Sequence, residues 1–340
     1  MKKISVLMLI VGILVCAGIA AAQKPAPAAT QKDIRGIMDA GLAAKQAKLD
    51  LPFEVFRTQY LPAQQGYQQV FFLKIKNADL GFAPAPASDV VDPSKPPTAP
   101  KMRAVVNLFL RIHKSENGVP GKLAREFASP ATIEVDQAGF DPEKTEWYTV
   151  GFGIKAGEYV AAIGLASQDR SRIGVQYCDF KLPEAKTFDA ALDTIPSFFI
   201  KEFKQVEGIE KNPVLDKGFF AYGNFQFVPS LDNVFAVGET LNFFSYVFGI
   251  KPTAIGPIEI ELGLEVVQGD KPAIKFASDA YDSALINLPL ALKQTLQIKQ
   301  GESVRNEIRD LPAGDYTLVM KIKDKGSALS AEKRIDFSIK

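Results

Sequence analysis

Residues 156–182 decide the fold. They read AGEYVAAIGLASQDRSRIGVQYCDFKL, and residues 313–339 repeat their pattern as AGDYTLVMKIKDKGSALSAEKRIDFSI. Both ends match at one constant offset without a gap, because Ala-Gly-acid-Tyr opens each stretch and Asp-Phe lies near the end of each. A match of both ends at a single offset predicts two copies of one module, each ending in this unit.

The repeated unit has the pattern of two strands. In the second copy, apolar side chains recur with a period of two residues, which is typical of a strand with one buried face: Tyr316, Leu318, Met320, Ile322 and then Ile335, Phe337, Ile339. Gly314 precedes the first strand and suits a turn with positive φ. The tyrosine that follows this turn resembles the tyrosine corner of immunoglobulin-like sandwiches, in which the hydroxyl bonds a nearby backbone group.

Further strands precede the unit in both copies. Alternation runs from Ala104 to Ile112 and from Ile260 to Val266, and residues 70–73 resemble residues 241–244. Turns rich in Gly and Pro separate these strands, and helical periodicity is scarce. The chain is therefore expected to be all-β, with two antiparallel immunoglobulin-like β-sandwich domains and a short N-terminal helix.

The first residues have the pattern of an export signal. Basic residues at 2–3, an apolar run at 4–15 and small residues at 20–22 predict a secretory signal peptide cleaved near Ala22-Gln23. The run is shorter than the roughly 20 residues that a membrane anchor needs, and Val15 is too large for lipidation at Cys16. We expect an exported protein, periplasmic or extracellular, without a transmembrane segment or a lipid anchor.

The rest of the chain divides into four parts. Thr30 is a candidate N-cap for a helix with apolar residues at 34, 37, 38 and 42, and six prolines make 83–100 an irregular insertion. Aromatic residues at 198, 199 and 203 indicate that the connector packs on a domain, as either helix or strand. The expected parts are the leader and helix at 23–50, module 1 at 51–186, the aromatic-rich connector at 187–217 and module 2 at 218–340.

Composition excludes several classes of function. The 40 Lys and Arg balance the 39 Asp and Glu, so nothing points to nucleic acid or to an anionic membrane. His113 is the single histidine, which leaves one candidate for any His-dependent site. After loss of Cys16 with the signal, Cys178 is alone, so no internal disulfide can form. We expect no cofactor and no metal ion.

Three residues of chemical interest have simpler structural interpretations. Cys178 corresponds to Ile335 in the other copy, which predicts a small core residue. His113 ends an alternating strand, which predicts a solvent-exposed strand end. Trp147 corresponds to Val304, which predicts a core or edge position rather than a sugar-binding surface.

Acidic residues offer a weak case for catalysis or metal binding. Glu259, Glu261 and Glu265 share one strand face, as in a glycosidase, but Lys321 and Lys323 on the expected neighbouring strand would pair with them. The aspartates with ligand chemistry are Asp270, Asp279, Asp282 and Asp310. Their spacing matches no calcium loop.

One asymmetry between the copies suggests an interaction surface. The outward face is charged in copy two but apolar in copy one, at Val105, Phe109, Val160, Ala162, Ala166 and Tyr177. An uncovered apolar sheet face is a liability in a secreted protein. We expect cover either by the 30–48 helix or by the 187–217 segment, with a partner surface as the rival explanation.

A family resemblance is carried by the last strands. The sequence from Leu311 to Leu318, LPAGDYTL, followed by Asp336-Phe337, resembles the closing strands of immunoglobulin-like or fibronectin-III-like modules in bacterial secreted proteins. It is similar to the C-terminal modules of the GWxTD-domain proteins, although the GWxTD sequence itself is absent. The resemblance implies the fold more than any function.

These observations predict an exported, non-catalytic binding or scaffold protein of the cell envelope, whose partner is a protein or another envelope component. Two alternatives remain open. One is a periplasmic chaperone that uses an edge strand, and the other is a carboxylate-dependent glycan hydrolase.

Overall fold

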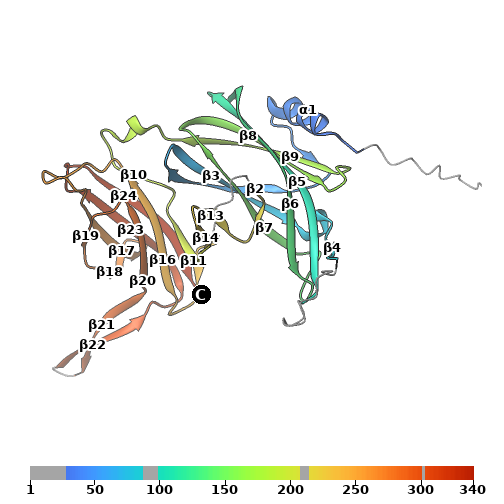
Figure 1. Ribbon diagram of the computed structural model, residues 1–340. Helices are drawn as coiled ribbons and strands as arrows, with labels where there is room; N and C mark the ends of the chain where they lie inside the picture. The colour runs from blue at the N-terminus through green and yellow to red at the C-terminus, as the bar shows by residue number, and fades with distance from the viewer. Residues whose placement is uncertain (1–27, 87–98, 207–213, 301–302) are drawn as a thin grey trace, which may run out of the picture.

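The computed structural model describes residues 28–86, 99–206, 214–300 and 303–340. The predicted signal peptide at 1–22, Cys16 and residues 87–98 of the proline-rich insertion lie outside the described residues. The chain is an all-β protein of several sheets with a short helix near its N-terminus, as predicted (Figure 1). Every pairing between named strands is antiparallel except the one that joins Val234–Phe235 to the last strand.

Four sheets build the body of the molecule, and we number them I to IV. Sheet I contains β1 (Lys48–Leu49), β4 (Ala83–Pro84), β5 (Lys101–Glu116), β6 (Val119–Asp136), β8 (Gly157–Ser167) and β9 (Ile173–Leu182). Sheet II contains β2 (Glu54–Ala63), β3 (Gly66–Lys76), β7 (Thr145–Ile154) and β12 (Asp216–Lys217).

The other two sheets come from the second half of the chain. Sheet III contains β10 (Asp193–Thr194), β11 (Phe198–Gln205), β13 (Phe220–Tyr222), β14 (Phe225–Pro229), β16 (Thr240–Phe248) and β20 (Leu285–Ala291). Sheet IV contains β15 (Val234–Phe235), β17 (Ile260–Gln268), β18 (Lys271–Lys275), β19 (Asp279–Tyr281), β23 (Gly314–Asp324) and β24 (Ser330–Ile339).

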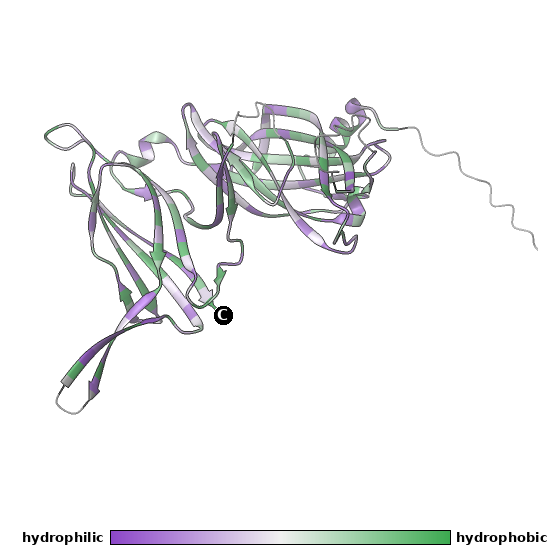
Figure 2. Cartoon of the chain, turned by 60° about the horizontal axis from the view of Figure 1, so that its bottom comes forward, coloured by the Kyte–Doolittle hydropathy of each residue, from purple (hydrophilic) through white to green (hydrophobic). Residues whose placement is uncertain are grey.

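The remaining elements are short. The helices are α1 (Gln31–Leu42), α2 (Asn77–Leu80) and the 3-10 turn η1 (Ala185–Phe188). A two-stranded hairpin of β21 (Lys293–Gln300) and β22 (Ser303–Asp310) projects from the second half of the chain (Figures 1 and 2).

The two copies of the repeated unit have the same local structure. The Tyr159 hydroxyl donates to the carbonyl oxygen of Lys155 over 3.1 Å, and the Tyr316 hydroxyl donates to that of Pro312 over 3.0 Å. Each ring stacks on the phenylalanine of the following strand, Phe180 or Phe337. The duplicated tyrosine corner predicted from the sequence is thereby confirmed.

The sheets pack in the order I, II, III, IV. One cluster of buried residues joins sheet I to sheet II, and another joins sheet III to sheet IV, so each pair forms a sandwich. A third cluster joins sheets II and III and is mainly aromatic; its buried rings are Phe72, Phe198, Phe220, Phe227 and Phe244. Sheets II and III are thus buried on both faces.

The connector provides part of this middle cluster. β11 lies between β14 and β16, so the aromatic segment that the sequence left undecided is a strand here. Phe198 faces the aromatic cluster, while Phe199 faces the core between sheets III and IV. Hydrogen bonds cross the same interface, from the Gln59 amide to the Pro196 carbonyl over 2.7 Å and from the Thr149 hydroxyl to the Phe219 carbonyl over 2.6 Å. A large apolar interface of this kind holds two domains in one orientation.

Phe198→Ala should destabilise the protein by about 3–5 kcal/mol, because it opens a cavity among buried rings. Phe203→Ala, on the same strand but 50% exposed, should cost about 1 kcal/mol. Urea unfolding followed by the fluorescence of Trp147, which packs on Phe72 in this cluster, measures both changes. Equal losses in the two variants would show that the cluster does not hold the sandwiches together.

Candidate functional site

The apolar face that the sequence singled out lies beneath α1. Phe109, Val160, Ala162 and Ala166 are buried in one cluster with apolar residues of the helix, and Tyr177 packs at its edge. The helix, and not the 187–217 segment, therefore covers this face, and these residues are not open to a partner in this structure. Val105 is half-buried and lines a separate hollow of about 880 Å³ at the end of sheet I.

α1 forms because its sequence satisfies its own N-terminus. The Thr30 hydroxyl accepts a hydrogen bond from the Asp33 amide over 3.2 Å, and the Asp33 carboxylate accepts one from the Thr30 amide over 2.8 Å. These hydrogen bonds make a capping box. The Thr30 hydroxyl also donates to the Asp33 carboxylate over 2.7 Å, and this hydrogen bond, followed by the one from the Thr30 amide, lowers the pKa of Asp33. Ile34, Met38 and Leu42 recur on one face and are the buried residues of the helix.

Small side chains on sheet I allow α1 to approach closely. A Cβ atom added at Gly164 would lie 3.2 Å from the Met38 sulfur and 3.3 Å from the Phe109 Cβ. The Tyr177 hydroxyl donates a hydrogen bond of 2.7 Å to the Met38 carbonyl oxygen. We call the face of sheet I beneath α1 the seat. Its shape fits the helix at the distance from the sheet, and in the rotation about the helix axis, that the structure shows.

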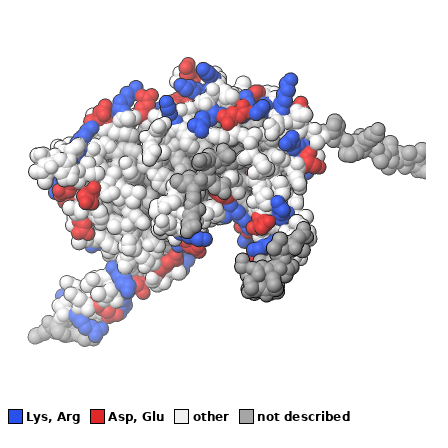
Figure 3. Space-filling model, in the orientation of Figure 1, with Lys and Arg blue, Asp and Glu red and all other residues white. Residues whose placement is uncertain are grey.

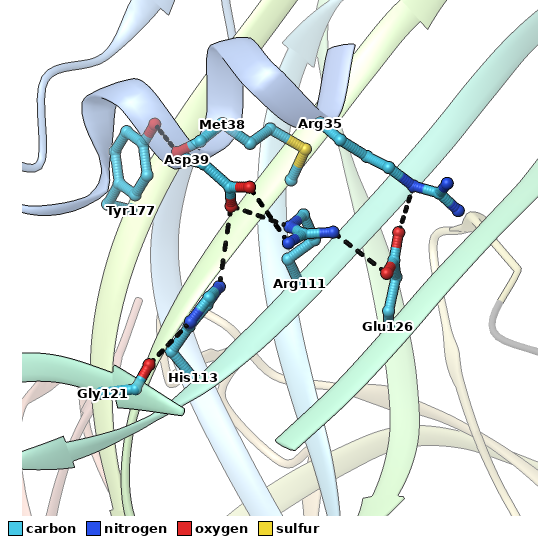
Figure 4. A network of polar contacts seen from close by, with 8 residues as sticks. All are labelled: Arg35, Met38, Asp39, Arg111, His113, Gly121, Glu126 and Tyr177. Carbon is cyan, nitrogen blue, oxygen red and sulfur yellow. Dashed lines mark hydrogen bonds and ion pairs between the residues drawn. The ribbon is translucent and has the colours of Figure 1, made fainter. Parts of the chain in front are cut away.

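Alternating charges line one side of the seat (Figure 4). Arg111 of β5 donates from Nε and Nη2 to the two carboxylate oxygens of Asp39, over 3.0 and 3.1 Å, and lies 3.0 Å from Glu126 of β6. Arg35 of α1 pairs with the same Glu126. The helix and the sheet each supply one acidic and one basic side chain. Because such charge-assisted hydrogen bonds are directional, the network sets where α1 lies on the sheet and also stabilises its docking.

His113 is not the solvent-exposed strand end that we predicted. It is only 7% exposed, because it shares the face of Phe109 and Arg111 that α1 covers. Its Nδ1 lies 3.1 Å from the Gly121 carbonyl oxygen, which can only accept, so Nδ1 carries the proton. Nε2 is buried without a hydrogen-bond partner, 3.9 Å from the Asp39 carboxylate. Through Asp39, His113 belongs to the same network that joins the helix to the sheet.

Cys178 and Trp147 pack against cores but are not fully buried. The thiol is half-buried against the core between sheets I and II. Burial, followed by the charge of Asp179, raises the pKa of this thiol to about 11. Trp147 is partly buried beside Phe72 in the aromatic cluster.

The carboxylates of sheet IV are held by lysines. β17 pairs with β23 as expected, and Glu261 lies opposite Lys323 in the register. The ion pair of Glu261 is made with Lys325 over 2.9 Å, and Glu265 lies 3.7 Å from Lys321. Both line a charged hollow of about 490 Å³ on the outer face of the sheet. The hydrogen bond from Lys325 lowers the pKa of Glu261, whereas the general acid of a glycosidase needs a raised one.

The remaining sequence candidates are not brought together. Glu259 is half-buried just before β17, and its carbonyl oxygen accepts a hydrogen bond from the Lys325 amide. Within the part of the chain that the structure describes, no three His, Cys, Asp or Glu side chains are grouped to hold a metal ion. The four aspartates with ligand chemistry therefore belong to no such group: Asp270, Asp279, Asp282 and Asp310.

The β21–β22 hairpin is a feature that the sequence pattern did not predict. Its base is anchored by the buried residues Leu292 and Leu311, joined by a hydrogen bond of 2.9 Å between the Leu311 amide and the Leu292 carbonyl. Beyond them, Ile308 is 69% exposed and Val304 is 55% exposed. The sequence signal for this hairpin was the small number of apolar residues between Leu292 and Leu311. Alternation alone does not tell a strand that projects into solvent from one that packs on a sheet.

Comparison with known proteins assigns no family. No family model matches the chain, and no curated protein matches it. Among solved structures, the native conformation of the E. coli alpha-2-macroglobulin is similar with 9% identity and a TM-score of 0.15. The match covers 84% of this chain and 16% of that chain, and so low a TM-score carries no argument about function. Neither α1 nor α2, the α-helices in the described part of the chain, is long and apolar enough to span a bilayer.

One substitution is expected to weaken the docking of α1 on sheet I, and another is expected to strengthen it. Met38→Glu places a carboxylate in the apolar seat, at a cost of several kcal/mol, and should release the helix. Gly36→Ala, at an exposed position with free space around it, should strengthen the helix by up to about 1 kcal/mol. Brief trypsin digestion at Lys32, Arg35 and Lys45 measures the result. We expect cleavage at least tenfold faster in the first variant and slower in the second, whereas equal rates in both would contradict docking.

The raised pKa of Cys178 predicts an unreactive thiol. With a pKa of about 11, the thiolate is only on the order of a thousandth of the total at pH 8, and it increases as the pH rises toward that value. Ellman's reagent should therefore modify the native chain about a hundredfold more slowly than the urea-unfolded chain. A fast reaction at pH 7 would contradict the burial of this side chain.

Proposed function

We propose that this protein is an exported, non-catalytic binding or scaffold protein of the cell envelope, and that the β21–β22 hairpin is its interaction element. One observation carries the proposal. Ile308 and Val304 are exposed on a strand that projects from the molecule and pairs only with β21 among the described strands. The export signal predicted from residues 1–22 supports the location.

The frame that holds the hairpin suits a scaffold. Leu292 and Leu311 anchor its base in the core between sheets III and IV. The aromatic cluster between sheets II and III joins that core to the first sandwich. A hairpin on such a frame is presented in a constant direction, which lowers the ordering cost of binding.

The environments of the reactive residues support a non-catalytic role. His113 is buried under α1, and the pKa of Cys178 is raised. Glu261 and Glu265 are ion-paired, which removes the main support for the glycan hydrolase alternative.

The alternative of a chaperone that uses an edge strand keeps one supporting observation, the free edges of the hairpin. β6 is a second long edge strand, since it pairs only with β5 among the described strands. It contains Pro120 and Pro130, which have no N–H to give to an added strand. The hairpin is therefore the better candidate edge.

Photo-crosslinking in the source cell tests the proposal. A photoreactive amino acid placed at Ile308 should give a discrete adduct with an envelope component after illumination, at least threefold more abundant than at Ile255. Ile255 is the matched control, because it is 88% exposed but lies in a loop of the second sandwich. Equal yields at both positions, or no adduct at Ile308, would reject the hairpin as the interaction element.

A further inference from the structure

We infer that the partner adds an extended segment to β22 as a further strand, and that acidic and aliphatic side chains alternate in this segment. The inference rests on the proposed function, because it takes the hairpin to be the interaction element. It names the backbone geometry and the side-chain chemistry of the partner.

The backbone of the hairpin offers an edge for strand addition. β21 and β22 pair continuously from Lys293↔Asp310 to Gln300↔Ser303. Neither strand pairs with any other described strand, so each leaves one row of N–H and C=O groups without a sheet partner. Such an edge is a template for an added strand. An isolated two-stranded hairpin is only marginally stable in water, so an added strand would also stabilise it.

The exposed aliphatic residues favour β22 over β21. Val304 and Ile308 both belong to β22 and, four residues apart on a strand, share one face. β18 contacts β21, so that strand already has a neighbour on the body of the protein. A segment alongside β22 would cover Val304 and Ile308 with aliphatic side chains of its own.

The opposite face of β22 carries an excess positive charge. Glu307 lies between two arginines, with Arg309 Nε 2.6 Å and Arg305 Nη2 3.3 Å from its two carboxylate oxygens. One carboxylate cannot neutralise two guanidinium groups, and both arginines are exposed. Figure 3 shows basic side chains on the projecting hairpin, with acidic side chains between them. Acidic side chains at alternate positions of the added segment would meet this face.

The same charges oppose a second copy of this chain as the occupant. Residues 293–310 carry four basic side chains, Lys293, Lys299, Arg305 and Arg309, against three acidic ones, Glu302, Glu307 and Asp310. Two hairpins paired edge to edge through β22 would bring the faces with Arg305 and Arg309 side by side, and these like charges would repel each other. Charge complementarity therefore selects an acidic partner segment.

Binding of designed peptides to the full chain without residues 1–22 tests the inference. The probe is a fluorescent ten-residue peptide that alternates Glu and Val, and its control alternates Lys and Val. We expect the Glu-Val peptide to bind at least tenfold more tightly. Amide exchange of residues 304–309 should slow at least fivefold in its presence.

Two pairs of substitutions locate the binding strand. Arg305→Glu with Arg309→Glu should weaken binding of the Glu-Val peptide at least tenfold and favour the Lys-Val peptide. Lys122→Glu with Arg125→Glu, on the edge strand β6, is the matched control and should leave both affinities unchanged. Val304→Ser with Ile308→Ser keeps the charges and should also weaken the Glu-Val peptide, which keeps the test valid if the charge variant unfolds the hairpin.

Several results would overturn the inference. They are equal binding of both peptides, loss of binding in the β6 variant, protection of β6 instead of β22, and self-association of the chain through the hairpin in sedimentation experiments. An adduct at Ile308 without any preference for the Glu-Val peptide would reject the strand chemistry but keep the proposed function. Absence of the adduct would reject the proposed function itself.

Discussion

The structure depends on the burial of both faces of two neighbouring sheets. Along β3, Phe71 and Leu73 face sheet I, while Val70 and Phe72 face sheet III. β11 repeats this arrangement, with Phe198 and Phe199 on opposite faces. A sheet with two apolar faces needs a layer on each side. The two sandwiches therefore cannot separate without exposing the aromatic cluster to water, and this cluster makes one body of a duplicated chain.

The same physical requirement explains α1. The outer face of sheet I is apolar where the corresponding face of sheet IV is charged, and the chain covers it with a helix of its own. Isolated helices of this length are marginal in water, so α1 depends on the seat as much as the seat depends on α1. The network of Asp39, Arg111 and Glu126 adds direction to an apolar contact that would otherwise permit sliding.

The hairpin differs from the sheets and α1, because apolar side chains on one of its strands stay exposed to solvent. On β22 the chain leaves both Val304 and Ile308 in solvent beyond a well-anchored base. Scattered exposed aliphatic residues are ordinary on a protein surface. Two on one face of a projecting strand, with a free edge and an excess of positive charge, are a more specific combination, and it is the combination that supports an interaction role.

Periodicity in the sequence by itself determined the all-β class, the duplicated unit with its tyrosine corners at Tyr159 and Tyr316, and the existence of α1 with its cap at Thr30, because these follow from interactions within a few residues along the chain. Only the tertiary structure decided what covers the apolar face, that His113 is buried, and that β22 stands free. Each of those outcomes depends on which distant segment packs against a face. Alternation shows that a strand has an apolar side, but only the packed chain shows whether another layer, a helix or solvent lies against it.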